Sequence, residues 1–189
     1  MPDKKVLGFA LCGSFCTFKK VITEMEKLSE FYDIVPIMSE GAASTDTRFG
    51  KAVDTVSTVE NICKMPVVHT IVEAEPIGPQ IALDMLVVAP CTGNTLAKLA
   101  SGITDSPVTM AVKAQLRCNR PVVIALATND ALSANLKNIG LLMSRKNIYF
   151  VPMKQDDPEK KPYSLVCDFD MLKSTMMAAF AGRQIMPIF

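Results

Sequence analysis

Short apolar runs alternate along this chain with longer segments whose apolar residues recur at the spacing of a helix. Several of the runs are apolar at almost every position, which is typical of parallel strands that are buried on both faces of a sheet. We expect strands at Val6–Leu11, Asp33–Met38, Asp84–Ala89, Pro121–Ala127 and Ile148–Val151.

The segments with helical spacing lie between and after these strands. We expect helices at Ser14–Phe31, Arg48–Lys64, Thr92–Ser101, Ser106–Cys118, Ala131–Ser144 and Asp168–Gln184. Strands that each lead into a helix predict an α/β fold: a Rossmann-like, doubly wound parallel sheet with helices on both faces. The sequence contains no repeat and no linker that would mark a second domain, so we expect a single domain over residues 1–189.

Two segments do not follow this alternation. Pro66–Glu75 fits either a short strand or an extended loop. Pro152–Ser164 is polar and contains three prolines. It is either a solvated connector or a loop that folds over a ligand and presents Lys154, Lys160 or Lys161 to an acidic group.

Composition excludes several classes of function. The formal net charge is +1, and no basic stripe is interleaved with aromatic residues, so we expect neither a nucleic-acid partner nor a membrane surface. No apolar run approaches the roughly 20 residues of a membrane-spanning helix. Twelve methionines and no tryptophan suggest soft packing and large contacts between subunits, as in a homo-oligomer.

The six cysteines are scattered, without a Cys-x-x-Cys pair and without histidine at metal-ligand spacing. We therefore expect small buried thiols in a reducing cytoplasm, and neither a disulfide framework nor a metal site. The single histidine, His69, lies among apolar residues. That setting favours a structural role, with a catalytic role as the alternative.

Small, hydroxyl or amide residues follow four of the expected strands. These turns contain Gly13-Ser14, Ser39, Pro90-Cys91-Thr92-Gly93-Asn94-Thr95, and Thr128-Asn129-Asp130. Because the carboxyl ends of parallel strands share one edge of a sheet, the four turns are expected to line one crevice. The crevice would be polar, nearly uncharged and about the size of a mononucleotide.

The first of these turns also limits the ligand. It lacks Gly-x-Gly-x-x-Gly, and the chain has no Gly-Lys-Ser/Thr loop, so neither a dinucleotide nor a nucleoside triphosphate is indicated. A single Gly-Ser at a helix start suits one phosphate group, and Ser14 is either its ligand or a simple helix cap. Glu40, after the second strand, is placed to meet a ribose hydroxyl or else is merely solvated.

Three motifs together resemble the FMN-binding flavoprotein family. They are Gly13-Ser14-x-x-x-x-Lys19, Pro90-x-x-x-Asn94-Thr95-x-x-Lys98-x-x-x-Gly102-x-x-Asp105, and the turn at Asn129. That family contains the peptidyl-cysteine and phosphopantothenoylcysteine decarboxylases and the flavin prenyltransferases. The resemblance implies FMN as cofactor, trimers or higher assemblies, and FMN-binding roles for Gly13, Ser14, Ser39, Pro90, Thr92, Asn94, Thr95, Asp105 and Asn129.

Further features resemble the dipicolinate synthase branch of the family, found in spore-forming bacteria. They are Thr47-Arg48-Phe49-Gly50, Glu75-Pro76-Ile77-Gly78-Pro79 and the Gln155–Ser164 loop. The resemblance implies oxidation of a dihydrodipicolinate during sporulation, with a separate A subunit of dipicolinate synthase that carries an NAD(P) site. Arg48, Lys160 and Lys161 are then candidates to meet the carboxylates of this small dicarboxylate substrate.

The chain also departs from the family's catalytic motifs. The decarboxylases carry a catalytic histidine just before the strand that corresponds to Asp84–Ala89, whereas His69 lies further upstream. Their substrate clamp is degraded to Ala125–Ser133, and the prenyltransferases' Arg-Glu is replaced by Ala127-Thr128. We therefore expect a flavin-dependent oxidoreductase subunit. The alternatives are a non-catalytic accessory subunit and a flavin-dependent decarboxylase of another substrate. Asp105 has a second interpretation, as the cap of the Ser106–Cys118 helix.

Overall fold

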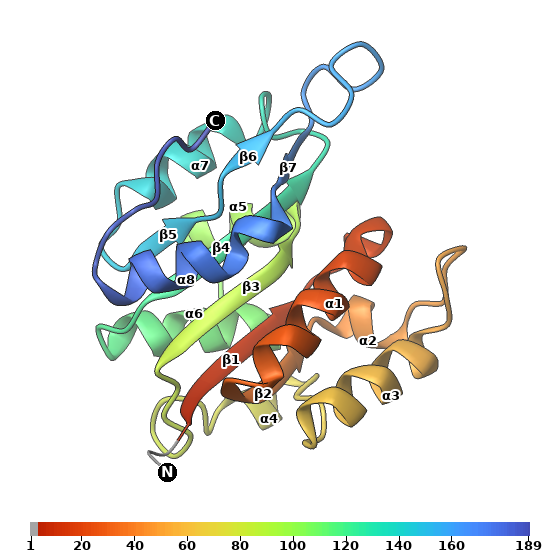
Figure 1. Ribbon diagram of the computed structural model, residues 1–189, viewed down its shortest axis with the longest axis vertical. Coiled ribbons are helices and arrows are strands. Elements are labelled where there is room, and N and C mark those ends of the chain that lie inside the picture. Colours follow the sequence, from red (N-terminus) through yellow and green to blue (C-terminus); the bar gives the residue numbers. More distant parts are fainter. Residues whose placement is uncertain (1–3) are drawn as a thin grey trace.

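A seven-stranded β-sheet forms the centre of the computed structural model, counted over residues 4–189, which the structure describes (Figure 1). The strands are β1 (Lys5–Leu11), β2 (Tyr32–Met38), β3 (Met85–Cys91), β4 (Val122–Thr128), β5 (Ile148–Phe150), β6 (Met153–Lys154) and β7 (Leu165–Cys167). Strands β2, β1, β3, β4 and β5 are neighbours in that order and run parallel. Strand β7 pairs antiparallel with β4, and β6 pairs antiparallel with β7.

The order of the parallel strands determines where a ligand can sit. The chain leaves β1 toward β2 on one side and later returns to β3 on the other side. The connections after β1 and after β3 therefore diverge, and a crevice opens between the carboxyl ends of these two strands. Such switch points are the usual ligand sites of open α/β sheets.

Helices cover both faces of the sheet, as the sequence predicted (Figure 1). Their bounds are η1 (Phe15–Thr17), α1 (Phe18–Ser29), α2 (Glu40–Ser44), α3 (Ala52–Cys63), α4 (Ile71–Ala74), α5 (Gly93–Ser101), α6 (Pro107–Arg117), α7 (Leu136–Met143), η2 (Phe169–Met171) and α8 (Leu172–Phe180). Helices α1 and α8 lie on one face, and α5, α6 and α7 lie on the other. The expected α/β class and doubly wound arrangement are thus confirmed.

The core lies between these layers. Every residue of β3 is buried, and so are six of the seven residues of β4. Burial of one Val, Leu or Ile side chain contributes about 1.5–3 kcal/mol, so these two strands anchor the sheet on which the crevice is built. No helix in the described part of the chain is long and apolar enough to cross a membrane.

The carboxyl-terminal part of the sheet differs from the prediction. Ile148–Val151 was expected to be the last strand, and Pro152–Ser164 a connector or loop. Instead β5 ends at Phe150, which leaves the edge of β4 unpaired at Ala127 and Thr128. Strand β7 satisfies the backbone groups there, because buried strand edges require hydrogen-bond partners. The polar segment thus contains β6 and the turn of a short β6–β7 hairpin.

Several helices begin or end elsewhere than expected. Helix α7 begins at Leu136, because the carbonyl of Asp130 accepts hydrogen bonds from the N–H groups of Ser133 and Asn135 and forms a turn. Helix α3 begins only at Ala52. Pro66–Glu75 contains both an extended part, where Val68 bridges to β2, and helix α4. Helix α2, five residues long, was not expected.

The terminal helix is shorter than the predicted Asp168–Gln184. It ends at Phe180, and Gly182 follows with a φ of +71°, a left-handed conformation that glycine adopts without strain. Gln184 then lies beside β5. Its Oε1 accepts a hydrogen bond of 2.8 Å from the N–H of Phe150, and its Nε2 donates one of 2.7 Å to the carbonyl of the same residue. The side chain thus takes the place of a neighbouring strand.

We expect Gln184→Leu to lower the free energy of unfolding by about 1–3 kcal/mol, because it leaves the N–H and C=O of Phe150 without these partners. Urea denaturation measures this change. Gln155→Leu is the control, since its amide bonds only one exposed carbonyl. Equal stability of the two variants would contradict the role given to Gln184.

Candidate functional site

Two adjoining cavities open at the carboxyl ends of the parallel strands. The first, which we call the switch-point cavity, measures about 410 Å³ and lies beside the ends of β1, β2 and β3. The second, the loop cavity, measures about 670 Å³ and extends from the ends of β1, β3 and β4 to the β6–β7 turn. They share Gly13, Phe15, Thr92 and Asn94 as lining residues. Each volume is within the range of small-molecule sites, roughly 300–1,000 Å³.

The structure brings together nearly all of the predicted cofactor residues. The switch-point cavity is lined by Gly13, Ser39, Thr92, Asn94, Thr95 and Asp105, and the loop cavity adds Ser14 and Asn129. Pro90 is the exception: it is buried in β3, where its carbonyl accepts a hydrogen bond from the N–H of Cys12. It lines neither cavity and instead fixes the end of β1 against β3.

The Gly13-Ser14 turn presents unpaired hydrogen-bonding groups to the loop cavity. Ser14 precedes η1, and its hydroxyl makes no capping hydrogen bond but only a long contact of 4.0 Å with the Cys16 sulfur. Within residues 4–189, the N–H groups of Phe15 and Cys16 have no hydrogen-bond acceptor. Because these groups stand at a helix start, they form a favourable site for an anion. The absence of a capping bond favours the ligand interpretation of Ser14 over the simple cap.

The start of α5 is built in a similar way. The Thr92 hydroxyl caps the N–H of Thr95 at 3.3 Å and donates to the Thr95 hydroxyl, which in turn donates to the Cys12 sulfur at 3.3 Å. These bonds occupy both threonine hydroxyls. The amide of Asn94 is exposed and lines both cavities. Asn94 is therefore the residue of this turn whose side chain is most available to a ligand.

Two other predicted residues, Ser39 and Asp105, have their polar groups occupied by the protein itself. Ser39 caps α2 by accepting a hydrogen bond from the N–H of Ala42. Asp105 is bound at 2.9 Å by Lys98, so both charges face the switch-point cavity as a pair. The interpretation of Asp105 as a helix cap is wrong, because Ser106 caps α6 in a reciprocal pair of bonds with Thr109.

A hydrogen-bonded cluster forms the floor of the loop cavity beside α5. The Asp130 carboxylate accepts hydrogen bonds from the Thr128 hydroxyl at 2.6 Å and from the Asn135 amide at 2.8 Å. Asn135 is buried and itself accepts a bond from Asn138. Gly93 packs so tightly on this cluster that a Cβ there would lie 2.6–2.7 Å from three of its polar atoms. We call Thr128, Asp130 and Asn135 the Asp130 cluster.

The β6–β7 turn supplies the outer wall of the loop cavity. Lys161 and Asp156 both line the cavity, and their Nζ and Oδ2 atoms form an ion pair of 2.9 Å. This pair raises the pKa of Lys161 and lowers that of Asp156. Lys161, predicted as a substrate residue, is thus at the cavity and charged. Arg48 and Lys160 do not line it: Arg48 stacks on the Phe49 ring, 4.9 Å from its centre.

His69 lies away from both cavities. Its Nδ1 is 3.2 Å from the carbonyl of Val67 and 3.4 Å from a carboxylate oxygen of Glu73. The side chain is half exposed beside α4. His69 is therefore not placed to take part in chemistry at either cavity, and its structural role stays a prediction.

Four of the six cysteines are buried, as expected, but Cys16 and Cys118 are exposed. Burial raises the pKa of Cys12 to about 11 although the Thr95 hydroxyl opposes the shift, and it raises the pKa of Cys63 to about 12. These thiols are therefore protonated near neutral pH, and Cys12 is not a nucleophile in the switch-point cavity. Within the described chain no three His, Cys, Asp or Glu side chains are grouped to bind a metal.

Sequence reasoning placed Asp130 in the turn after β4 but gave it no role of its own, and it did not place Phe15, Cys16, Phe49 or Asp156 at the crevice. The position of Asp130 at a strand end was a usable signal. The two phenylalanines gave no such signal, because isolated aromatic residues in loops resemble ordinary packing residues. Their rings contribute flat apolar surface to an otherwise polar cavity.

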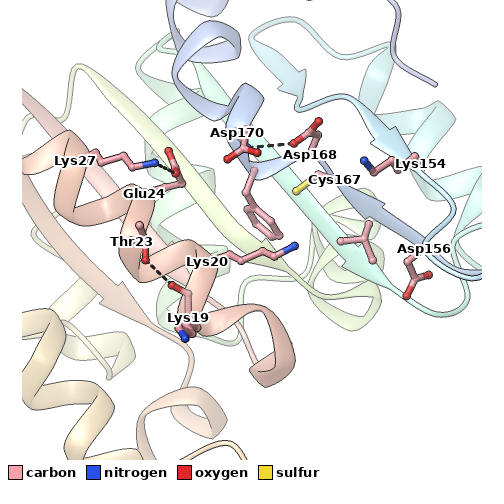
Figure 2. A pocket seen from close by; sticks show the side chains of 12 residues that line it. Lys19, Lys20, Thr23, Glu24, Lys27, Lys154, Asp156, Cys167, Asp168 and Asp170 are labelled. Atoms are coloured by element: carbon pink, nitrogen blue, oxygen red, sulfur yellow. Dashed lines mark hydrogen bonds and ion pairs between the residues drawn. The ribbon is translucent and has the colours of Figure 1, made fainter.

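A third cavity lies behind the β6–β7 wall, between that hairpin and α1 (Figure 2). It measures about 580 Å³ and shares Asp156 and Val166 with the loop cavity. Four lysines and four carboxylates line it, and Lys27 is already paired with Glu24 at 2.6 Å. With its charges balanced in this way, the cavity has no clear preference for anions or cations. No residue predicted to bind the cofactor lines it.

The sequence and the fold were compared with those of known proteins. A family model described as flavoprotein matches residues 1–180. The chain belongs to the flavoprotein family. Among the relatives in this family, the B subunit of dipicolinate synthase from Bacillus subtilis is 46% identical over 97% of this chain and 92% of its own length.

Two solved structures resemble this chain to different degrees. The B subunit of dipicolinate synthase from Bacillus halodurans is 44% identical and superposes with a TM-score of 0.89, over 97% of this chain and 95% of that one. The FMN-dependent cysteine decarboxylase SpaF is 23% identical, with a TM-score of 0.69 over 95% and 98% of the two chains. This second likeness concerns the fold alone.

Proposed function

We propose that this protein binds FMN at the two adjoining cavities and acts as the B subunit of a dipicolinate synthase, oxidising dihydrodipicolinate to dipicolinate during sporulation. The observation that carries the proposal is the pair of helix starts, at Gly13–Cys16 and Thr92–Asn94, that present hydrogen-bond donors to one crevice. Membership of the flavoprotein family and the likeness to two dipicolinate synthase B subunits support it.

The residues of the crevice fit a flavin mononucleotide. The uncapped Ser14 hydroxyl and the free N–H groups of Phe15 and Cys16 suit its single phosphate. Hydroxyl and amide groups around the switch-point cavity, among them Asn94, suit the polar edge of the ring and the ribityl chain. When bound, FMN would supply the two-electron acceptor that no side chain provides.

The chain's own residues then have to hold the substrate and exclude water. Loss of hydride from a dihydropyridine is favoured by the aromaticity of the product, so correct positioning accounts for much of the rate that is needed. Phe15 and Phe49 offer flat surfaces at the cavity wall, and Lys161 offers a positive charge. The lining residues within the described chain include no histidine, which fits a reaction centred on a cofactor.

The proposal includes the partners implied by the relatives' names. The protein would work as a homo-oligomer in the cytoplasm of a spore-forming bacterium, together with the A subunit of dipicolinate synthase. That partner would provide the NAD(P) site. A second candidate function is that of an accessory subunit without flavin, which is also supported because the described residues that line the two cavities include no histidine–carboxylate pair.

The visible spectrum of the purified protein with and without added FMN tests the proposal. We expect either a yellow protein or a spectral shift of added FMN on binding. Absence of binding at high micromolar FMN would contradict the flavin enzyme and support the accessory subunit. Release of CO₂ from candidate thiols would indicate the alternative decarboxylase.

We expect Ser14→Ala to weaken FMN binding by about 10- to 100-fold, because it removes a hydrogen bond to a charged phosphate. Asn94→Ala, which removes a neutral bond, is expected to weaken it about 2- to 10-fold. Quenching of flavin fluorescence measures both affinities. The controls are Ser57→Ala and Asn61→Ala, exposed residues of α3 outside the cavities. If all four variants bind FMN equally well, the site has been placed wrongly.

A further inference from the structure

The loop cavity has one basic side chain among its lining residues within the described chain, and that residue is Lys161. Its neighbour Lys160 is exposed on the same turn but lines neither this cavity nor the switch-point cavity. Two adjacent lysines, equal in charge and chain length, thus differ in whether they reach the cavity. Comparison of variants of the two lysines therefore separates the effect of a positive charge at the cavity from the effect of a positive charge elsewhere on the turn.

The backbone around Lys161 is anchored to the body of the protein. The N–H of Lys161 donates to the carbonyl of Asp157 at 2.7 Å, and its carbonyl accepts from the N–H of Ser164 at 3.0 Å. The Ser164 hydroxyl donates to the carbonyl of Thr128 at the end of β4. Lys161 therefore stands on a turn that is joined to the same strand end as the Asp130 cluster.

The ion pair with Asp156 orients the ammonium group of Lys161 but does not occupy all of its N–H donors. A lysine ammonium has three N–H donors, and Asp156 accepts one of them at 2.9 Å. Two donors remain for a ligand. The other carboxylate that lines the cavity, Asp130, already accepts hydrogen bonds at both of its oxygens from Thr128 and Asn135.

We infer that Lys161 binds one carboxylate of a planar aromatic dicarboxylate in the loop cavity, that Asp156 holds the ammonium group in position, and that Lys160 takes no part. The inference rests on the proposed function for the class of substrate. It adds Lys161 as the residue that recognises the negative charge of the substrate. A carboxylate there shares the ammonium group with Asp156, so the existing ion pair need not break.

Titration calorimetry with dipicolinate, in the presence of saturating FMN, tests the inference. We expect Lys161→Met to weaken binding about 10- to 100-fold, because a charge-assisted hydrogen bond is lost. Lys160→Met and Lys161→Arg are expected to bind within about 3-fold of wild type, since both keep a cation at the cavity. The uncharged pyridine-2,6-dicarboxamide should not distinguish Lys161→Met from Lys160→Met. The Tm of both methionine variants should match wild type, because the Lys161 side chain is more than half exposed.

The outcomes separate this inference from the proposed function. Equal dipicolinate affinity of Lys161→Met and Lys160→Met would overturn the inference and leave the proposed function standing. Failure of the wild-type protein to bind dipicolinate at millimolar concentration would overturn both. If FMN does not bind but dipicolinate still binds in a Lys161-dependent manner, the inference is supported and the flavin part of the proposed function fails.

Discussion

Replacement of Gly93 with alanine is expected to lower the free energy of unfolding by about 1–3 kcal/mol and to abolish measurable FMN binding. The added Cβ would lie 2.6 Å from the Asn135 Nδ2 and the Thr128 Oγ1, and 2.7 Å from the Asp130 Oδ1. These atoms hold one another through short hydrogen bonds, so none can yield alone. The first turn of α5 must therefore shift instead, and the N–H groups of this turn face the cavity.

Urea denaturation and flavin fluorescence measure the two effects of Gly93→Ala. Gly140→Ala is the control, because Gly140 lies within α7 and a Cβ there meets no atom within 4 Å. We expect the control to be stabilised by about 0.5–1 kcal/mol, as is usual for Gly→Ala in a helix. A Gly93→Ala protein as stable as this control would show that α5 can move away from the Asp130 cluster at little cost.

Asp130→Ala is expected to destabilise the protein by about 1–3 kcal/mol, because the buried Asn135 amide loses its acceptor. The substitution removes the acceptor of both the Thr128 hydroxyl and the Asn135 amide. Asp130→Asn should have an intermediate effect, since its amide oxygen can still accept one of these bonds. Chemical denaturation measures the free energy of unfolding of the two variants, which is expected to be lower for Asp130→Ala than for Asp130→Asn.

Asn129→Ala is the matched control for the Asp130 variants. Its side chain is exposed, and we expect the free energy of unfolding to stay within about 0.5 kcal/mol of wild type. Its expected effect is on FMN binding instead, because it lines the loop cavity. If Asn129→Ala proved as destabilising as Asp130→Ala, the cluster would not be the source of the stability of this turn.

The parallel part of the fold could be predicted from the sequence because its strands are buried on both faces. In β3 and β4 nearly every residue is apolar, and no other environment accepts such a run so readily. The hairpin β6–β7 could not be predicted in this way. Its strands have two and three residues, too few for a periodic pattern, and a proline-rich turn separates them.

The approximate place of the candidate site followed from topology alone. Turns after parallel strands must meet at one edge of the sheet, so residues as distant in sequence as Ser14, Asn94 and Asn129 now line a single cavity. The role of each residue in the cavity could not be predicted in the same way, because it depends on which side chains lie beside it in the fold. Asp105 is paired with Lys98, a contact between α5 and the following loop that no local pattern specifies.

Close packing was the other property hidden from the sequence. Gly93 looked like one more small residue of a turn, yet the structure shows that three polar side chains leave no space for a Cβ. Those side chains come from the following strand end and from the residue before α7. Likewise, nothing in the adjacent pair Lys160-Lys161 tells which lysine faces the cavity.

The two sides of the loop cavity are attached to the molecule with very different strength. On one side, β3 is paired in parallel with β1 through four residue pairs and with β4 through four residue pairs, within the core. On the other, β7 is joined to β4 through two residue pairs, Ala127 with Val166 and Thr128 with Leu165. Because local opening follows the smallest loss of backbone hydrogen bonds, we expect the amide hydrogens of β7 to exchange with solvent faster than those of β3.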